Sequence, residues 1–144
     1  MGQNPTKKMA AITLGALLFG ELVGAGAVLF FRLQGNFHPD LNGTENQLEL
    51  IAIVFGLTMI PGGFLFRRFL AAKAEGRSGL DGAQARYAAF LIPVTLVEAA
   101  FLFAIVVWLL APESSAAPTL AVLLFLATLY LGWTGVRLVG EEDE

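Results

Sequence analysis

Cysteine is absent from the 144-residue chain, and the single histidine, His38, lies in a stretch rich in turn-forming residues. The lack of cysteine excludes a disulfide framework, thiolate metal sites, cysteine nucleophiles and iron–sulfur ligation. One loop histidine provides no ligand cluster for zinc and no helical ligand for haem. No glycine-rich phosphate-binding loop ending in Lys and Ser or Thr is present. We therefore expect no cofactor, no metal site and no enzymatic activity.

Charged residues are also scarce. They make up 15% of the chain, against 56% hydrophobic residues, whereas globular domains contain about 25% charged and 45–50% apolar residues. Most of the 9 Lys and Arg and the 12 Asp and Glu lie between or beyond long apolar runs. A soluble domain would instead spread its charges over its surface. The composition predicts a membrane protein.

Four apolar segments are long enough to cross a bilayer, because a transmembrane helix needs about 20 mostly apolar residues. They cover residues 9–31, 48–66, 88–111 and 119–139. We predict an all-α membrane protein, an antiparallel bundle of four transmembrane helices. Residues 1–144 then form a single domain, with a short N-terminal tail at 1–8 and an acidic C-terminal tail at 140–144.

Lys and Arg are distributed unequally between the two sides of the predicted bundle. Eight of the 9 fall on one side: Lys7, Lys8, Arg67, Arg68, Lys73, Arg77, Arg86 and Arg137. Only Arg32 falls on the other side. Loops rich in Lys and Arg remain in the cytoplasm, so both termini are predicted to be cytoplasmic and residues 32–47 and 112–118 to face outward.

Small residues are predicted to mediate packing between the helices, because lipid supplies no hydrophobic force and close approach depends on small side chains. The first segment carries a stripe at helical spacing that consists of Thr13, Ala16, Gly20, Gly24 and Ala27. Gly20 and Gly24 form a small-xxx-small pair, and Gly56 contributes to a similar surface on the second segment. These glycines are predicted to lie inside the bundle.

Pro61, Gly62 and Gly63 predict a kink in the second segment. Proline removes a backbone donor, and two following glycines ease bending. The kink has two readings that the sequence leaves open. It is either a hinge lining a polar cavity, as in transporters with broken helices, or a packing kink near a helix end.

Two carboxyl groups are predicted at mid-depth in the membrane. Glu21 and Glu98 each lie about 15–18 Å along their helices from the cytoplasmic edge, and Thr58 and Thr128 reach a similar level. No Lys, Arg or His shares that depth, so we expect both acids to be protonated or to share a proton. Three roles remain open: polar contacts between helices, a proton or monovalent-cation site, and a binding site for a partner subunit or a lipid headgroup.

The hairpin at residues 48–111 resembles that of the proteolipid c subunit of rotary ATP synthases. The similarity is carried by the apolar stretch from Thr95 to Leu110, which contains Glu98 and follows a basic loop. It implies that Glu98 binds the transported ion. The hairpin lacks the Arg-Gln-Pro loop motif and the dense glycine repeat of that family, and the other two segments have no counterpart in it.

The whole chain is similar to small uncharacterised four-span proteins of the bacterial inner membrane. The similarity rests on a basic second-to-third loop, an aromatic residue at Tyr87 and the Glu98-Ala99-Ala100 run. It implies an inner-membrane location without an assigned activity. We expect a structural or accessory subunit whose partners are the lipid bilayer and either a second copy or another membrane subunit, and not nucleic acid. The alternative is a small oligomeric protein that translocates protons or cations through Glu98 and Glu21.

The predicted orientation can be tested with single cysteines, since the chain has none of its own. Cysteines placed at Asn42 and Ser115 should react with a membrane-impermeant thiol reagent added from outside, and a cysteine at Ser78 should not. External labelling at position 78 would reverse the orientation.

Overall fold

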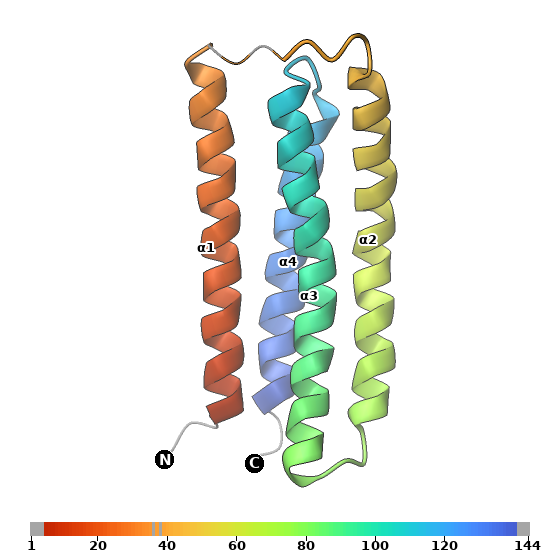
Figure 1. Ribbon diagram of the computed structural model, residues 1–144. Coiled ribbons are helices and arrows are strands. Elements are labelled where there is room, and N and C mark those ends of the chain that lie inside the picture. The colour runs from red at the N-terminus through yellow and green to blue at the C-terminus, as the bar shows by residue number, and fades with distance from the viewer. Residues whose placement is uncertain (1–4, 36, 38, 141–144) are drawn as a thin grey trace.

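The computed structural model describes residues 5–35, 37 and 39–140, and these residues form four long α-helices (Figure 1). The helices are α1 (Pro5–Leu33), α2 (Glu45–Ala74), α3 (Gly79–Leu110) and α4 (Ala116–Gly140). All four are long and apolar enough to span a membrane. The predicted fold class, an all-α bundle of four candidate transmembrane helices, is confirmed.

The helices extend beyond the apolar segments by which they were predicted. The extension is largest between the second and third segments, where residues 67–87 were expected to form a loop but only residues 75–78 connect the helices. Helix formation depends on backbone hydrogen bonds and on residues such as Ala, Lys and Arg as much as on hydrophobicity. The charged residues of this region therefore continue the helices past their apolar parts.

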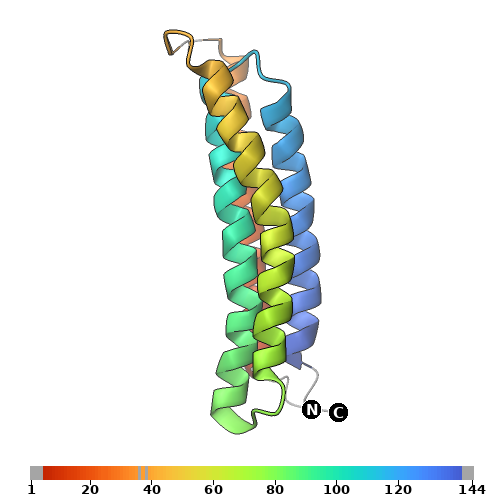
Figure 2. The ribbon, with the colours of Figure 1, turned by 90° about the vertical axis from the view of Figure 1, so that its right-hand side faces the viewer.

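The bundle has an open arrangement with α3 and α4 in the centre. α1 packs against α3 and α4 on one side, α2 packs against the same two helices on the other, and α1 and α2 do not contact each other. Figures 1 and 2 show the four helices nearly parallel, with α1 and α2 on opposite sides of the central pair. We call the end where α1 begins and α4 ends the proximal end, and the opposite end the distal end.

The core lies along α3 and α4. Fully buried side chains of these helices include Phe90, Val94, Val97, Leu124 and Leu131. In contrast, only four of the described side chains of α1 are buried, those of Ala10, Leu14, Glu21 and Val28. Its remaining surface exposes large apolar side chains, among them Phe19, Leu22 and Phe30. Such a surface is suited to contact with lipid. α1 therefore packs against the central helices only along the narrow line of its buried residues, which we call its seam.

The predicted small-residue stripe is only partly used for packing. A Cβ atom at Gly24 would lie 3.1 Å from Ile105 of α3, and one at Gly56 would lie 2.7 Å from Leu120 of α4. The prediction that Gly20 packs inside the bundle is wrong, because Gly20 is exposed and a Cβ atom there would meet nothing within 4 Å. With α2 out of reach of α1, only one side of α1 is covered.

The predicted kink region forms part of a continuous helix. α2 runs from Glu45 to Ala74 with Pro61 inside it, and Figure 2 shows the helix curving gently without a break. Gly63 is the closely packed residue of this region: a Cβ atom there would lie 3.0 Å from Val97 and 3.2 Å from Leu131. Gly63 therefore allows α2 to approach both central helices.

Gly63 and Gly62 offer a matched pair for testing this close approach. Gly63→Leu should destabilise the bundle by about 1–3 kcal/mol, the usual cost of overpacking, because the larger side chain must displace its neighbours in α3 and α4. Gly62→Leu makes the same chemical change where a Cβ atom meets nothing within 4 Å and should have little effect. The measurement is the midpoint of thermal unfolding in detergent, and equal losses for both variants would contradict this packing.

Candidate functional site

A buried polar contact joins α1 to α4 in the middle of the bundle. Glu21 is 0% exposed, and its Oε1 lies 3.0 Å from the hydroxyl oxygen of Thr128, which is also 0% exposed. The same hydroxyl lies 3.0 Å from the backbone oxygen of Leu124, one turn earlier in α4. The other oxygen of Glu21, Oε2, is buried and has no hydrogen-bond partner among the residues that the structure describes.

Glu98 of α3 lies close enough to Glu21 for the two carboxyl groups to interact electrostatically. It belongs to the stripe of α3 that faces α1: Tyr87 lies three turns before it and Ile105 two turns after it, and both contact α1. Glu98 is only partly buried. Its carboxyl group makes no hydrogen bond within the described part of the chain, in contrast to Glu21.

Thr58 lies outside this group, contrary to the predicted polar belt through all four helices. It is exposed on the side of α2 that faces away from α3 and α4, and its hydroxyl donates a 2.7 Å hydrogen bond to the backbone oxygen of Val54. Because α2 and α1 do not contact each other, the Thr58 side chain cannot contact Glu21. The structure therefore brings together Glu21, Glu98 and Thr128.

Two further polar contacts attach α1 to the central helices. Toward the proximal end, the hydroxyl groups of Thr13 and Tyr87 form a 3.0 Å hydrogen bond. At the distal end, the Arg32 guanidinium donates hydrogen bonds to the backbone oxygens of Trp108 (3.1 Å) and Pro112 (2.7 Å) and lies 5.1 Å from the centre of the Trp108 ring. Carbonyl groups in the last turn of a helix lack helical partners, and a cation there is favourable.

Sequence reasoning alone does not predict these contacts. In the sequence Arg32 stands out as the one Lys or Arg on its side of the predicted bundle, and this position is a signal that it has a specific partner there. Another missed residue is Arg67 of α2, which donates hydrogen bonds to the Thr134 hydroxyl and, at 3.2 Å, to the Leu131 backbone oxygen of α4. Nothing in the sequence spacing pairs α2 with these groups, because that pairing depends on how the helices pack.

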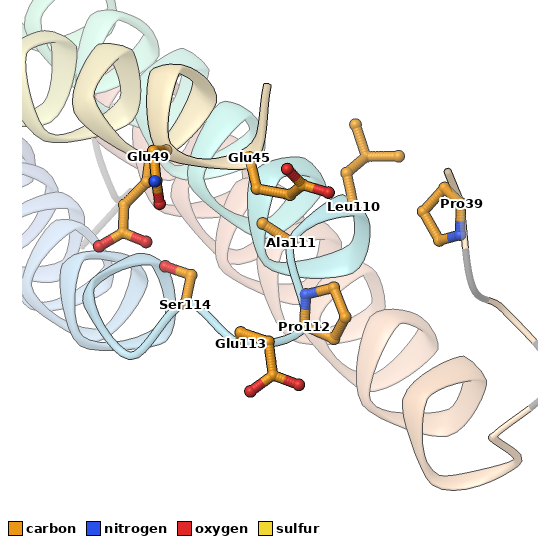
Figure 3. A pocket seen from close by; sticks show the side chains of 9 residues that line it. Pro39, Glu45, Glu49, Leu110, Ala111, Pro112, Glu113 and Ser114 are labelled. Carbon is orange, nitrogen blue, oxygen red and sulfur yellow. The ribbon is translucent and has the colours of Figure 1, made fainter. Parts of the chain in front are cut away.

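A pocket of about 380 Å³ opens at the distal end between the start of α2 and the connection from α3 to α4 (Figure 3). Its lining includes three carboxylates, those of Glu45, Glu49 and Glu113. Figure 3 shows these side chains pointing in different directions. Among the residues searched, which are those the structure describes, no group of three or more His, Cys, Asp or Glu could hold a metal ion.

Comparison of the chain with protein-family models, with curated proteins and with solved structures gives no match. Functional assignment therefore depends on the geometry around Glu21 and Glu98.

Proposed function

We propose that this chain is a non-enzymatic accessory component of a membrane, and that it binds a partner within the bilayer where α1 and α3 meet. The observation that carries the proposal is the position of Glu98. Glu98 is partly exposed in the middle of a bundle whose outer surface is mostly apolar, and its carboxyl group has no hydrogen-bond partner among the described residues. Lipid tails offer no donor to such a group, and a partner helix would supply one.

The surface beside Glu98 allows a helix to approach closely. On α1 it consists of three exposed small residues, Ala16, Gly20 and Ala27, and we call these three together with Glu98 the α1–α3 face. Small residues permit close backbone contact between membrane helices. Charge complementarity then indicates the partner: a transmembrane helix that places a basic or amide side chain at mid-depth, beside Glu98.

We place the protein in a bacterial inner membrane, with both termini in the cytoplasm. Support for the orientation comes from the Lys and Arg residues, eight of which lie at or near the proximal end. Arg32 is the exception. It lies at the distal end, where its guanidinium donates hydrogen bonds to backbone oxygens at the end of α3. In this orientation the pocket lined by Glu45, Glu49 and Glu113 opens to the outside.

The α1–α3 face can be tested by affinity purification from native membranes in mild detergent. Wild type should bring down a stoichiometric membrane protein with a basic or amide residue at mid-helix. Glu98→Leu should reduce its recovery about tenfold, because an interhelical hydrogen bond in lipid contributes about 1–2 kcal/mol. Gly20→Leu should also reduce recovery, since the added side chain fills the face at a position where a Cβ atom meets nothing within 4 Å in the chain.

The matched control is Thr58→Leu, which removes an exposed polar group from the opposite side of the bundle and should leave recovery unchanged. Each variant must elute as a single species, so that lost recovery does not reflect misfolding. Wild type without a stoichiometric partner, or a partner that remains on both face variants, would contradict the proposal.

A second candidate function is translocation of protons or monovalent cations. It is favoured by the proximity of Glu21 and Glu98. These two ionisable groups come from different helices, lie at one depth and interact electrostatically. The resemblance of residues 48–111 to the proteolipid hairpin would assign ion binding to Glu98. In this function Glu98, the more exposed of the two acids, would take up the ion and release it at the outer surface of the bundle.

Liposome flux measurements test this second function. Purified wild type should conduct protons or sodium above the level of empty liposomes, and Glu98→Gln should abolish the flux because an amide cannot ionise. Glu21→Gln tests the supporting role of the buried acid, and Thr58→Val, at an exposed and distant site, should conduct normally. A wild-type flux equal to that of empty liposomes would exclude translocation by this chain alone.

A further inference from the structure

The hydroxyl group of Thr128 has one proton but lies within hydrogen-bond distance of two oxygens. These are Glu21 Oε1 and the Leu124 backbone oxygen, both at 3.0 Å. A hydroxyl group donates once and can accept at its lone pairs, and a backbone carbonyl can only accept. If the Thr128 proton goes to Leu124, the contact with Glu21 is a hydrogen bond only when Glu21 donates. A carboxyl group donates only when it carries a proton.

The surroundings of Glu21 also favour the neutral form. Its Oε2 is buried without a hydrogen-bond partner among the described residues. An ionised carboxylate there would leave negative charge unsatisfied, whereas the carbonyl oxygen of a neutral carboxyl group costs much less to bury. The neighbouring helices offer no compensation: α3 presents another acid, Glu98, and α4 presents the neutral Thr128.

The basic residues of these three helices lie toward the ends of the bundle. α1 carries Lys7, Lys8 and Arg32, α3 carries Arg86, and α4 carries Arg137, which lies against the ring of Trp133. The titratable Tyr87 of α3 is paired with Thr13, two turns from Glu21 along α1. No described cation of these helices therefore neutralises Glu21 at mid-depth.

We propose that Glu21 is a proton-binding site. The proton resides on Oε1 and is donated to Thr128, and the Thr128 hydroxyl then donates to the Leu124 backbone oxygen. This chain of two hydrogen bonds ties α1 to the backbone of α4. The proposal depends on contacts within one chain and holds whether or not the α1–α3 face binds a partner.

The same geometry selects a proton over Ca²⁺ or Mg²⁺. The described side-chain oxygens in contact here are the two of Glu21 and the hydroxyl of Thr128, and Ca²⁺ and Mg²⁺ require about six or more oxygen ligands. Thr128 is also committed to Leu124 in α4. A single proton on Glu21 is enough to complete the hydrogen bonds from Glu21 to Thr128 and from Thr128 to Leu124.

Infrared spectroscopy of the lipid-reconstituted protein at neutral pH tests the proposal through the carbonyl-stretch band of a protonated carboxyl group. The measurement is made in a Glu98→Gln background, so that the second acid contributes nothing to the band: Glu98→Gln should show the band, and adding Glu21→Gln should remove it. Thr128→Val should keep the band but shift it to higher frequency, because the carboxyl proton loses its acceptor. Thr128→Ser, which preserves the hydroxyl group, should leave the band near its position in Glu98→Gln alone.

Two results would overturn the assignment. One is a Glu98→Gln spectrum without the band, or with a band that remains when Glu21→Gln is added. The other is an unshifted band in Thr128→Val. The second result is obtained with Glu21 in place, so it remains decisive even if Glu21→Gln does not fold.

Discussion

The hydrogen bond between Glu21 and Thr128 is the interaction on which the placement of α1 depends. In the hydrocarbon interior of a membrane no water is present to satisfy a polar group, so a carboxyl group there must find its partner in protein. Glu21 meets this requirement by turning inward to α4, and it is completely buried. Its position fixes which side of α1 faces the central helices, and the other residues of the seam, Leu14 and Val28, follow at two-turn intervals on either side.

Polar contacts at three depths hold α1, which buries little apolar surface. They are the Thr13–Tyr87 bond toward the proximal end, the Glu21–Thr128 bond at the middle, and the bonds of Arg32 to the end of α3. Because apolar contact between helices gains little over contact with lipid, such bonds matter more here than in a soluble bundle. α2 differs, since it approaches α3 and α4 closely through Gly56 and Gly63.

The two mid-depth acids have different surroundings and therefore suit different roles. Glu21 is enclosed and bonded within the chain, which fits a group that retains a proton. Glu98 lies on the same interface but at its edge, partly exposed and beside the small residues of α1. That position fits recognition by another helix. Two carboxyl groups at one depth are thus distinguished by their burial and by their hydrogen bonds.

The sequence by itself determined the number of spans, the antiparallel order and the depth of Glu21, Glu98 and Thr128, because these follow from apolar length and from the rise per residue of a helix. Tertiary structure alone decided which side of each helix is covered. Each span is apolar around most of its circumference, since lipid and protein interior favour the same side chains, so periodicity does not separate a buried face from a lipid-facing one. For that reason the sequence predicts Thr58 and Gly20 inside the bundle although both are exposed, and it does not identify the backbone oxygens that Arg32 contacts at the end of α3.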